Sequence, residues 1–266
     1  MIAVIYAYYE KNEEYKDNIR FFFKNGISSD PHIHYYVIVN GYATPDIIST
    51  IANHTNTTIL YRANEGYDFA AFHYVLEHID KIHMTYTHTI FLNTSCRGPF
   101  IPPYCNTHWT SAFTSMIRGE VKLVGPTINV HLRPTNRTSY CLLSHVQSYA
   151  FAVDAECLQF LINKGLFNMS FNTLHDVVTN QEIGMSTLIL QNDWNIGSFV
   201  KEYNSRDYAT LTDTFNHLAN CKFGDIVFPG DLCFGRDIHP YEVMFLKTSR
   251  NVSSKELRSL THAFMR

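Results

Sequence analysis

Short apolar runs alternate with amphipathic segments through the first hundred residues of the chain. Runs rich in β-branched and aromatic residues predict buried strands, at 2–7, 34–39, 57–61 and 87–92. Between these runs, apolar residues recur three or four positions apart, as on amphipathic helices, over 13–25, 45–53 and 68–82. Strands that alternate with helices form βαβ units, so the pattern predicts an α/β fold with a central, mostly parallel sheet flanked by helices.

The second half of the chain carries the same two patterns less regularly. Further strands are expected at 121–125, 145–153 and 194–199. Further helices are expected at 107–118, 155–164, 181–191 and 254–265. No repeat, low-complexity tract or Pro/Gly/Ser-rich linker divides the sequence, so we expect a single domain over residues 1–266.

Composition narrows the class of protein. The chain is 45% apolar and 14% aromatic, which excludes a disordered chain, a coiled coil and a collagen-like fibre. Its net charge of −3 does not favour a nucleic-acid partner bound through bulk positive charge. No apolar run reaches the length of a membrane span. Because the N-terminus also lacks the features of a secretion signal, we expect a cytoplasmic protein with reduced cysteines.

A polar segment follows the third predicted strand and opens the next helix, over residues 62–69. In parallel α/β sheets, ligands bind at the carboxyl ends of strands, where a helix N-terminus offers free N–H groups to a phosphate. Gly66 would let the backbone approach such a ligand closely, whereas Asp68 could simply cap the helix. The chain has no G-x-G-x-x-G or phosphate-loop motif, so ordinary dinucleotide or kinase-type binding has no support.

Three more polar segments are candidates for chemistry. Asn93-Thr94-Ser95 ends the fourth predicted strand, either as a cluster facing a diphosphate or metal or as a plain transition into a loop. Glu182 stands near a helix start, where the helix dipole favours a carboxylate whatever its role. Residues 236–242 gather five ionisable side chains in a loop, which is a common place for a site and equally for solvated charge.

Taken in order, these segments resemble the GT-A-type nucleotide-sugar glycosyltransferases. They are most similar to the rhamnan-synthesis type and to glycosyltransferases of large algal DNA viruses (chlorovirus-like). The residues that carry the resemblance are 64–68, 92–99, 123–128, 148–154 and 239–245, and it spans roughly residues 2–250. It implies a GT-A-like (Rossmann-like) single domain. Residues 1–98 would bind the nucleotide sugar, 99–250 the acceptor, and 251–266 would form a closing helix.

The resemblance also implies an activity and its residues. A sugar would pass from a nucleotide-sugar donor, such as UDP-xylose, to a hydroxyl of a glycan or glycoprotein acceptor; xylose, rhamnose, galactose and glucose all stay open. Inverting displacement needs a carboxylate base, for which Glu182 matches best and Asp154 second. Donor contacts are implied for Ala7, Tyr8, Asn40, Asn64, Gly66, Asp68, Asn93, Ser95 and Arg97.

The fourth-strand motif departs from that family. GT-A enzymes usually have Asp-x-Asp there to bind a divalent cation, but this chain has Asn93-Thr94-Ser95. A neutral amide and hydroxyls are poor ligands for Mn²⁺ or Mg²⁺. Asp68 and His239 are the candidates to compensate. Alternatively, the leaving diphosphate would be stabilised without metal by a basic residue, for which the candidates are Arg97, Arg236 and Lys247.

Two other functions fit parts of the sequence. A non-catalytic glycan- or nucleotide-binding protein of the same fold would account for the missing Asp-x-Asp motif. A hydrolase with Asp154 and Glu182 as its carboxylate pair would use water as acceptor and need no nucleotide. A metallohydrolase is the least favoured, because the 14 histidines include no H-E-x-x-H motif.

Overall fold

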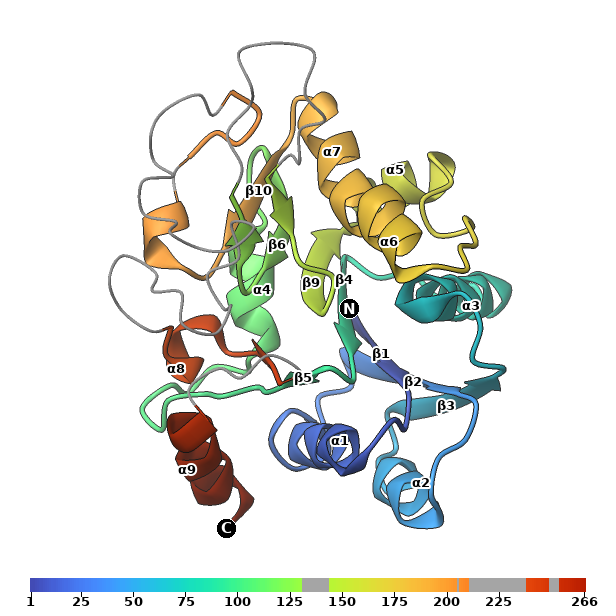
Figure 1. Ribbon diagram of the computed structural model, residues 1–266, viewed down its shortest axis with the longest axis vertical. Helices are drawn as coiled ribbons and strands as arrows, with labels where there is room; N and C mark the ends of the chain where they lie inside the picture. Colours follow the sequence, from blue (N-terminus) through green and yellow to red (C-terminus); the bar gives the residue numbers. More distant parts are fainter. Residues whose placement is uncertain (131–143, 205, 211–237, 249–253) are drawn as a thin grey trace.

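A seven-stranded sheet forms the centre of the protein (Figure 1). The structure, a computed structural model, describes residues 1–130, 144–204, 206–210, 238–248 and 254–266. The strands in chain order are β1 (Ile2–Tyr8), β2 (Ile33–Asn40), β3 (Thr57–Arg62), β4 (His88–Asn93), β6 (Val121–Gly125), β9 (Ala150–Asp154) and β10 (Asn195–Ser198). Across the sheet they lie in the order β10-β6-β9-β4-β1-β2-β3. All pairs are parallel except those of β9, which runs antiparallel to both β4 and β6.

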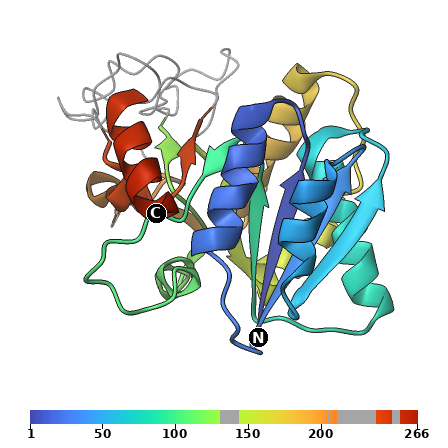
Figure 2. The same cartoon turned by 90° about the horizontal axis from the view of Figure 1, so that it is seen from below.

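Helices cover both faces of this sheet (Figures 1 and 2). One face carries α1 (Glu13–Asn25), α2 (Pro45–Ala52) and α4 (Thr110–Met116). The other carries α3 (Tyr67–Lys81), α5 (Ala155–Asn163) and α7 (Gly184–Gln191). Alternate side chains of β1 enter the two cores, which explains why this strand is apolar throughout rather than alternating. The predicted fold class, a mostly parallel mixed sheet flanked by helices, is therefore confirmed.

Aromatic side chains fill both cores. On the α3 face, Phe91 of β4 stacks on Phe151 of β9 with ring centroids 4.7 Å apart, and Phe72 of α3 meets Phe91 at 4.9 Å. On the α1 face, Trp109 packs edge-on against Phe245 at 5.2 Å. These contacts bury large apolar areas and fix the strands on which the polar residues at the sheet edge stand.

The pairing of β5 (Cys96–Arg97) with β11 (Leu246–Lys247) brings the C-terminal part of the chain to the end of β4. Further elements are β7 (Ile128–Asn129), β8 (His145–Val146), η2 (Lys201–Tyr203), α8 (Pro240–Val243) and α9 (Ser254–Met265). The strands β11 and β5 pair antiparallel, with Lys247 opposite Cys96. Cys96 lies three residues beyond the end of β4 in the sequence. Figure 2 shows α9 beside α1, where Phe264 packs 5.7 Å from Phe21. The C-terminal helix is thus anchored on the first half of the fold.

The second half corrects two predicted elements. The strand expected at 145–153 is two strands, β8 and β9, separated by a bend at 147–149. The helix expected at 181–191 begins earlier, with α6 (Leu174–Val177) and the π-helical segment η1 (Val178–Ile183) leading into α7. Its true start carries a capping signal, since the Thr173 hydroxyl accepts the N–H of Asp176 at 3.2 Å.

The expected reduced cysteines and the expected lack of a membrane span can be compared with the described residues. Among these residues, Cys96, Cys105 and Cys157 are free thiols. None of the helices in those ranges has both the length and the apolar character that crossing a membrane requires.

Candidate functional site

The carboxyl ends of β1, β2 and β4 lie side by side at one end of the sheet, called the carboxyl edge below, and hydrogen bonds join them. The opposite end, where these strands begin, is called the amino edge. Directly after β4, Thr94 donates its N–H to the carbonyl oxygen of Ala7 at 3.1 Å, and its hydroxyl to the same oxygen at 2.9 Å. Asn40, the last residue of β2, donates to the carbonyl oxygen of Tyr8 at 3.2 Å. The predicted donor residues at the ends of β1 and β2 therefore do lie together.

Tyr8 and Asn40 are nevertheless engaged by the protein itself. The Tyr8 ring is fully buried, and its hydroxyl donates to Glu10 at 2.9 Å. The side-chain oxygen of Asn40 accepts from Nη1 of Arg62 at 2.8 Å, and Nη2 of the same guanidinium donates to the carbonyl oxygen of Glu65 at 2.6 Å. Arg62 thus folds the turn after β3 back against the end of β2.

That turn places a glycine at the start of α3. Gly66 has φ +68°, and a Cβ there would lie 2.8 Å from the Cβ of Ala70, so the position requires glycine. Tyr67 follows with φ +58°, which is uncommon for a residue with a side chain. Asn64 is exposed on the turn. The N-cap of α3 is Gly66 and no side chain caps it, so the interpretation of Asp68 as the helix cap is wrong.

Asp68 instead faces the end of β4. Its Oδ2 accepts from the amide nitrogen of Asn93 at 2.6 Å. The other end of that amide, Oδ1, accepts from the N–H of Ser95 at 3.0 Å and from its hydroxyl at 2.6 Å. Asp68, Asn93 and Ser95 therefore form one hydrogen-bonded chain across the carboxyl edge.

The electrostatics of Asp68 identify its neighbours. Desolvation raises the pKa of its carboxyl to about 6, although the hydrogen bond from Asn93 lowers that pKa. The positive charge of Lys247 lowers this pKa and the negative charge of Glu182 raises it. One ammonium and one carboxylate from distant parts of the sequence therefore lie within electrostatic range of Asp68. Such a group at the carboxyl edge of a parallel sheet is typical of a functional site.

Glu182 reaches this group from the π-helical segment η1. Its side chain is buried, and Oε2 accepts from both the N–H of Ser148 at 2.7 Å and the Ser148 hydroxyl at 2.5 Å. Lys247 stands on β11 with its Nζ 5.9 Å from the ring centroid of Tyr149. π-Helical turns occur often at functional sites, which fits the position of Glu182.

Asp154, the second candidate base, lies at the opposite edge of the sheet. Because β9 runs antiparallel, its last residue pairs with His88, the first residue of β4. The Asp154 carboxylate caps α5, accepting the N–H of Cys157 at 2.8 Å, and pairs with Lys122 at 2.8 Å. The structure therefore separates Asp154 from Glu182 and gives its carboxylate a structural role.

Two further predicted residues do not join the site. Arg97 donates through Nε to Asn18 of α1 at 2.9 Å and through Nη1 to Thr261 of α9 at 3.3 Å, so its guanidinium holds these helices to β5. His239 caps α8, and its Nε2 lies 3.0 Å from Glu256 of α9. Arg236 falls outside the described residues.

The site does not fit a divalent cation. Within the described ranges, no three His, Cys, Asp or Glu side chains are grouped as metal ligands. At the position of the family's Asp-x-Asp motif, the Asn93 amide is engaged at both ends, by Asp68 and Ser95. His239, the expected extra ligand, is turned to Glu256. Asp68 is the carboxylate nearest that motif, and its Oδ2 already accepts from Asn93.

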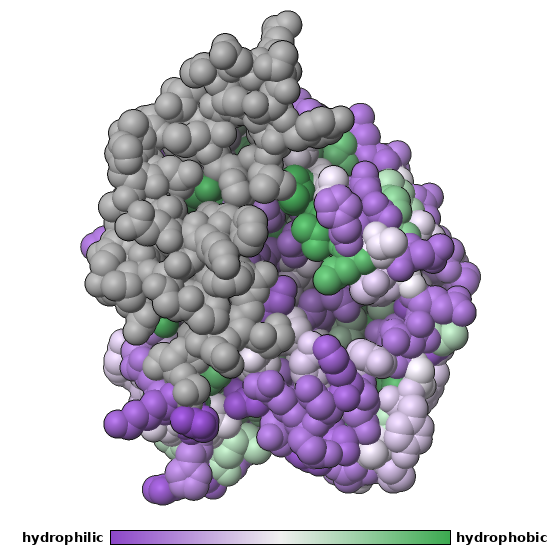
Figure 3. Space-filling model, viewed as in Figure 1, coloured by the Kyte–Doolittle hydropathy of each residue, from purple (hydrophilic) through white to green (hydrophobic). Residues whose placement is uncertain are grey.

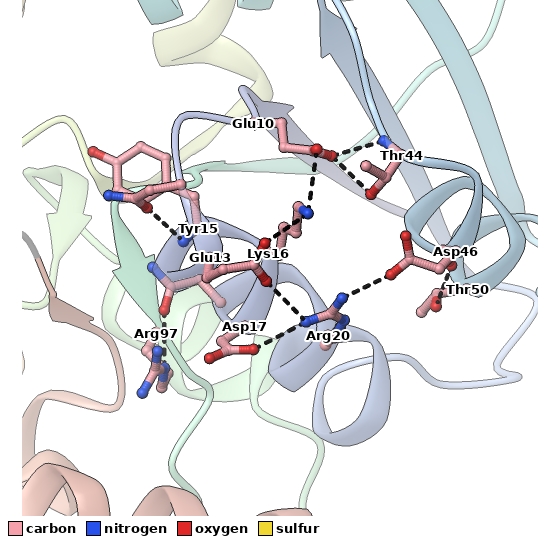
Figure 4. A network of polar contacts seen from close by, with 12 residues as sticks. Glu10, Glu13, Tyr15, Lys16, Asp17, Arg20, Thr44, Asp46, Thr50 and Arg97 are labelled. Atoms are coloured by element: carbon pink, nitrogen blue, oxygen red, sulfur yellow. Dashed lines mark hydrogen bonds and ion pairs between the residues drawn. The ribbon is translucent and has the colours of Figure 1, made fainter.

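Sequence reasoning missed Glu10, which organises the loops after β1 and β2 (Figure 4). Its Oε2 accepts from the Tyr8 hydroxyl at 2.9 Å, and from the Thr44 N–H and hydroxyl at 2.8 and 3.1 Å. Lys16 lies 3.6 Å from its other oxygen. Desolvation disfavours the charge, but the hydrogen bonds from Thr44 and Tyr8 hold the pKa of Glu10 below its usual value. The available signal was a carboxylate two residues after a fully buried strand.

The solved structures that resemble this fold include three glycosyltransferases. A mannosyltransferase of Pyrobaculum calidifontis, PcManGT, in complex with GDP-Man and Mn²⁺, is 14% identical, with a TM-score of 0.49 over 74% of this chain and 54% of that one. TarS 1-349 of S. aureus, in complex with UDP-GlcNAc, is 12% identical, with a TM-score of 0.44 over 74% and 55%. A glycosyltransferase involved in glycosylation of the major capsid of PBCV-1 is 10% identical, with a TM-score of 0.33 over 67% and 74%.

Sequence comparison is more specific. The chain spans about half the length of PcManGT and of TarS 1-349. A search of curated proteins found no match. The family model described as "Rhamnan synthesis protein F" matches residues 35–221, well over half of the sequence. That stretch includes the turn before α3, the end of β4 and the segment that carries Glu182. The chain belongs to the rhamnan synthesis protein F family.

Proposed function

We propose that this protein is a glycosyltransferase that binds a nucleotide sugar at the carboxyl ends of β1, β2 and β4. The observation that carries the proposal is the hydrogen-bonded chain of Asp68, Asn93 and Ser95 at that edge, with Lys247 and Glu182 in electrostatic range of Asp68. Membership of the rhamnan synthesis protein F family supports the same activity. Residues 1–98 would hold most of the donor, and residues 99–250 would supply the base and the acceptor surface.

The donor would lie along the loops that Glu10 and Arg62 hold in place. Tyr9 directly follows β1 and Tyr42 lies two residues after β2, with 42% and 67% of their surface exposed, so their rings are available to stack on a nucleobase. A UDP-sugar, such as UDP-xylose, is the donor we would test first. The sugar would then extend toward Asp68 and Ser95, whose polar atoms suit sugar hydroxyls.

Transfer would proceed by direct displacement with inversion. Glu182 would take the proton of the acceptor hydroxyl as its oxygen forms a bond to the anomeric carbon. The bond from that carbon to the diphosphate oxygen breaks at the same time, and its electron pair leaves with the diphosphate. The Lys247 ammonium would stabilise the negative charge that develops there. The proposed mechanism uses no divalent cation, because the described residues at this edge do not form a cation site.

The acceptor would be a glycan, free or on a glycoprotein. Sugar rings have apolar faces and polar rims, and they bind surfaces that mix both kinds of side chain. On the face seen in Figure 3, the described surface is mainly polar, with apolar side chains gathered near its middle. The family description, rhamnan synthesis, supports a carbohydrate acceptor.

Calorimetric titration of the purified protein with UDP, GDP, TDP and CMP tests the donor site. We expect saturable binding of one nucleotide. The matching nucleotide sugar, offered with a panel of glycan acceptors, should then release that nucleotide. If none of the four nucleotides binds, with or without added Mn²⁺, the transferase proposal fails.

A second candidate is a non-catalytic binding protein of the same fold, favoured by the Asn93-Thr94-Ser95 sequence at the end of β4. It predicts nucleotide or glycan binding without release of nucleoside diphosphate from any donor and acceptor pair. The same titration followed by the same release assay separates the two functions.

A further inference from the structure

The carboxylate of Glu182 is held asymmetrically. Both hydrogen bonds from Ser148, one from its N–H and one from its hydroxyl, end on the same oxygen, Oε2. The two residues are 34 positions apart, and Ser148 lies in the bend between β8 and β9. Two donors on one oxygen fix both the position and the rotation of a carboxylate, and they leave Oε1 as the oxygen that can accept a proton.

A second contact joins the same two segments without touching Glu182. One helical turn further on, the Ser186 hydroxyl accepts the N–H of Val146 at 3.1 Å. Ser186 and Ser148 therefore both fasten the helical segment to the region of β8 and β9. Only Ser148 contacts the carboxylate, so Ser186 provides a matched control for the loss of one serine hydroxyl.

We propose that Ser148 is a positioning residue that presents Oε1 of Glu182 to the acceptor hydroxyl. This inference rests on the proposed function, in which Glu182 is the base. Proton transfer depends steeply on the distance and alignment of donor and acceptor, so a carboxylate free to rotate spends less time in the productive geometry. Binding of the nucleotide sugar would be unaffected, because Ser148 contributes nothing to the loops after β1 and β2.

The first test compares three serine variants by steady-state kinetics. Ser148→Ala keeps the N–H bond and loses the hydroxyl bond, so we expect kcat to fall about 10-fold with the donor KM within about 2-fold. Ser148→Thr restores the hydroxyl at a position that is only partly buried, and should recover most of the activity. Ser186→Ala should lower the melting temperature as much as Ser148→Ala does while leaving kcat within about 2-fold.

A double-mutant cycle separates this inference from the proposed function. If Ser148 acts through Glu182, then Ser148→Ala should cause no further loss in a Glu182→Gln background. A full additional 10-fold loss there, or equal loss of kcat in Ser148→Ala and Ser186→Ala, would overturn the positioning role. If Glu182→Gln itself keeps normal turnover, the base assignment fails instead, whatever the serine variants do.

Discussion

Two aspartates, each just after a turn or strand and at the start of a helix, have opposite environments in this fold. Asp154 is an ordinary N-cap of α5 and forms an ion pair with Lys122. It lies at the amino edge of the sheet, beside the first residue of β4. Asp68 caps nothing, faces Asn93 at the carboxyl edge, and has a pKa raised to about 6 by desolvation. One carboxylate stabilises the fold, while the other costs stability.

That difference shows which edge of the sheet carries the chemistry. Folding alone does not favour a desolvated carboxylate beside the like charge of Glu182, because burial and repulsion both oppose its ionisation. Such groups persist where a ligand or a reaction uses them. The amino edge has no comparable conflict around Asp154. The contrast therefore supports a donor site at the carboxyl edge.

Removing the positive charge at the carboxyl edge should have a large effect on turnover. Lys247→Met should lower kcat/KM for the nucleotide sugar by about 10²-fold, because the leaving diphosphate loses its counter-charge. Lys247→Arg should keep part of the activity. The matched control is Lys122→Met, which removes an ammonium from the amino edge and should leave kcat/KM unchanged. Equal kinetic losses in Lys247→Met and Lys122→Met would remove the distinction between the edges.

Neutralising each aspartate should change stability in opposite directions. Asp68→Asn should raise the free energy of unfolding at pH 7 by about 2 kcal/mol, because the carboxyl ionises near pH 4 in the unfolded chain but near pH 6 in the folded one. Asp154→Asn should lower it by up to about 1 kcal/mol, through loss of the ion pair with Lys122. Chemical denaturation at pH 7 measures both.

The pH dependence gives the sign of the Asp68 effect independently. Between about pH 4 and 6 the folded protein holds a proton on Asp68 that the unfolded chain has released, so ionisation costs stability as the pH rises. The gain in Asp68→Asn relative to wild type should therefore be small at pH 4 and complete above pH 6. A gain that is constant across this range would contradict the raised pKa.

Chelation should have the smallest effect. Because Lys247 supplies the counter-charge, we expect turnover in EDTA to change by about 2-fold at most. Release of nucleoside diphosphate in EDTA, compared with added Mn²⁺ or Mg²⁺, measures this directly. Activity that disappears in EDTA and returns with Mn²⁺ would show a cation site that the described residues do not form.

The sequence predicted the first half of the fold well, because β1, β2 and β4 are buried on both faces and each helix has an apolar stripe. The bend at 147–149 was missed, since Gln147-Ser148-Tyr149 contains no Gly or Pro to mark it. Sequence analysis allowed Asp68 to be a helix cap and gave Asp154 as the second candidate base, whereas in the structure Asp154 is the cap. Only the left-handed turn at Gly66 moves the start of α3 and turns Asp68 toward Asn93.

The candidate site could be predicted only where it is local in sequence. Asn93 and Ser95 were identified from the end of one strand, but the contact of Glu182 with Ser148 joins positions far apart in the chain. Arg97 and His239 were assigned to the site through the resemblance to the family. Their partners, Thr261 and Glu256, come from the C-terminal helix, and nothing local announces those contacts.

The most direct test of the central claim compares Glu182→Gln with Asp154→Asn in one assay of nucleoside diphosphate release. Both variants replace a carboxylate by an amide, one at each edge of the sheet. The account predicts that Glu182→Gln binds the nucleotide normally and loses about 10²- to 10⁴-fold in kcat, while Asp154→Asn keeps wild-type kcat. Normal turnover in Glu182→Gln, or an equal loss in Asp154→Asn, would contradict it.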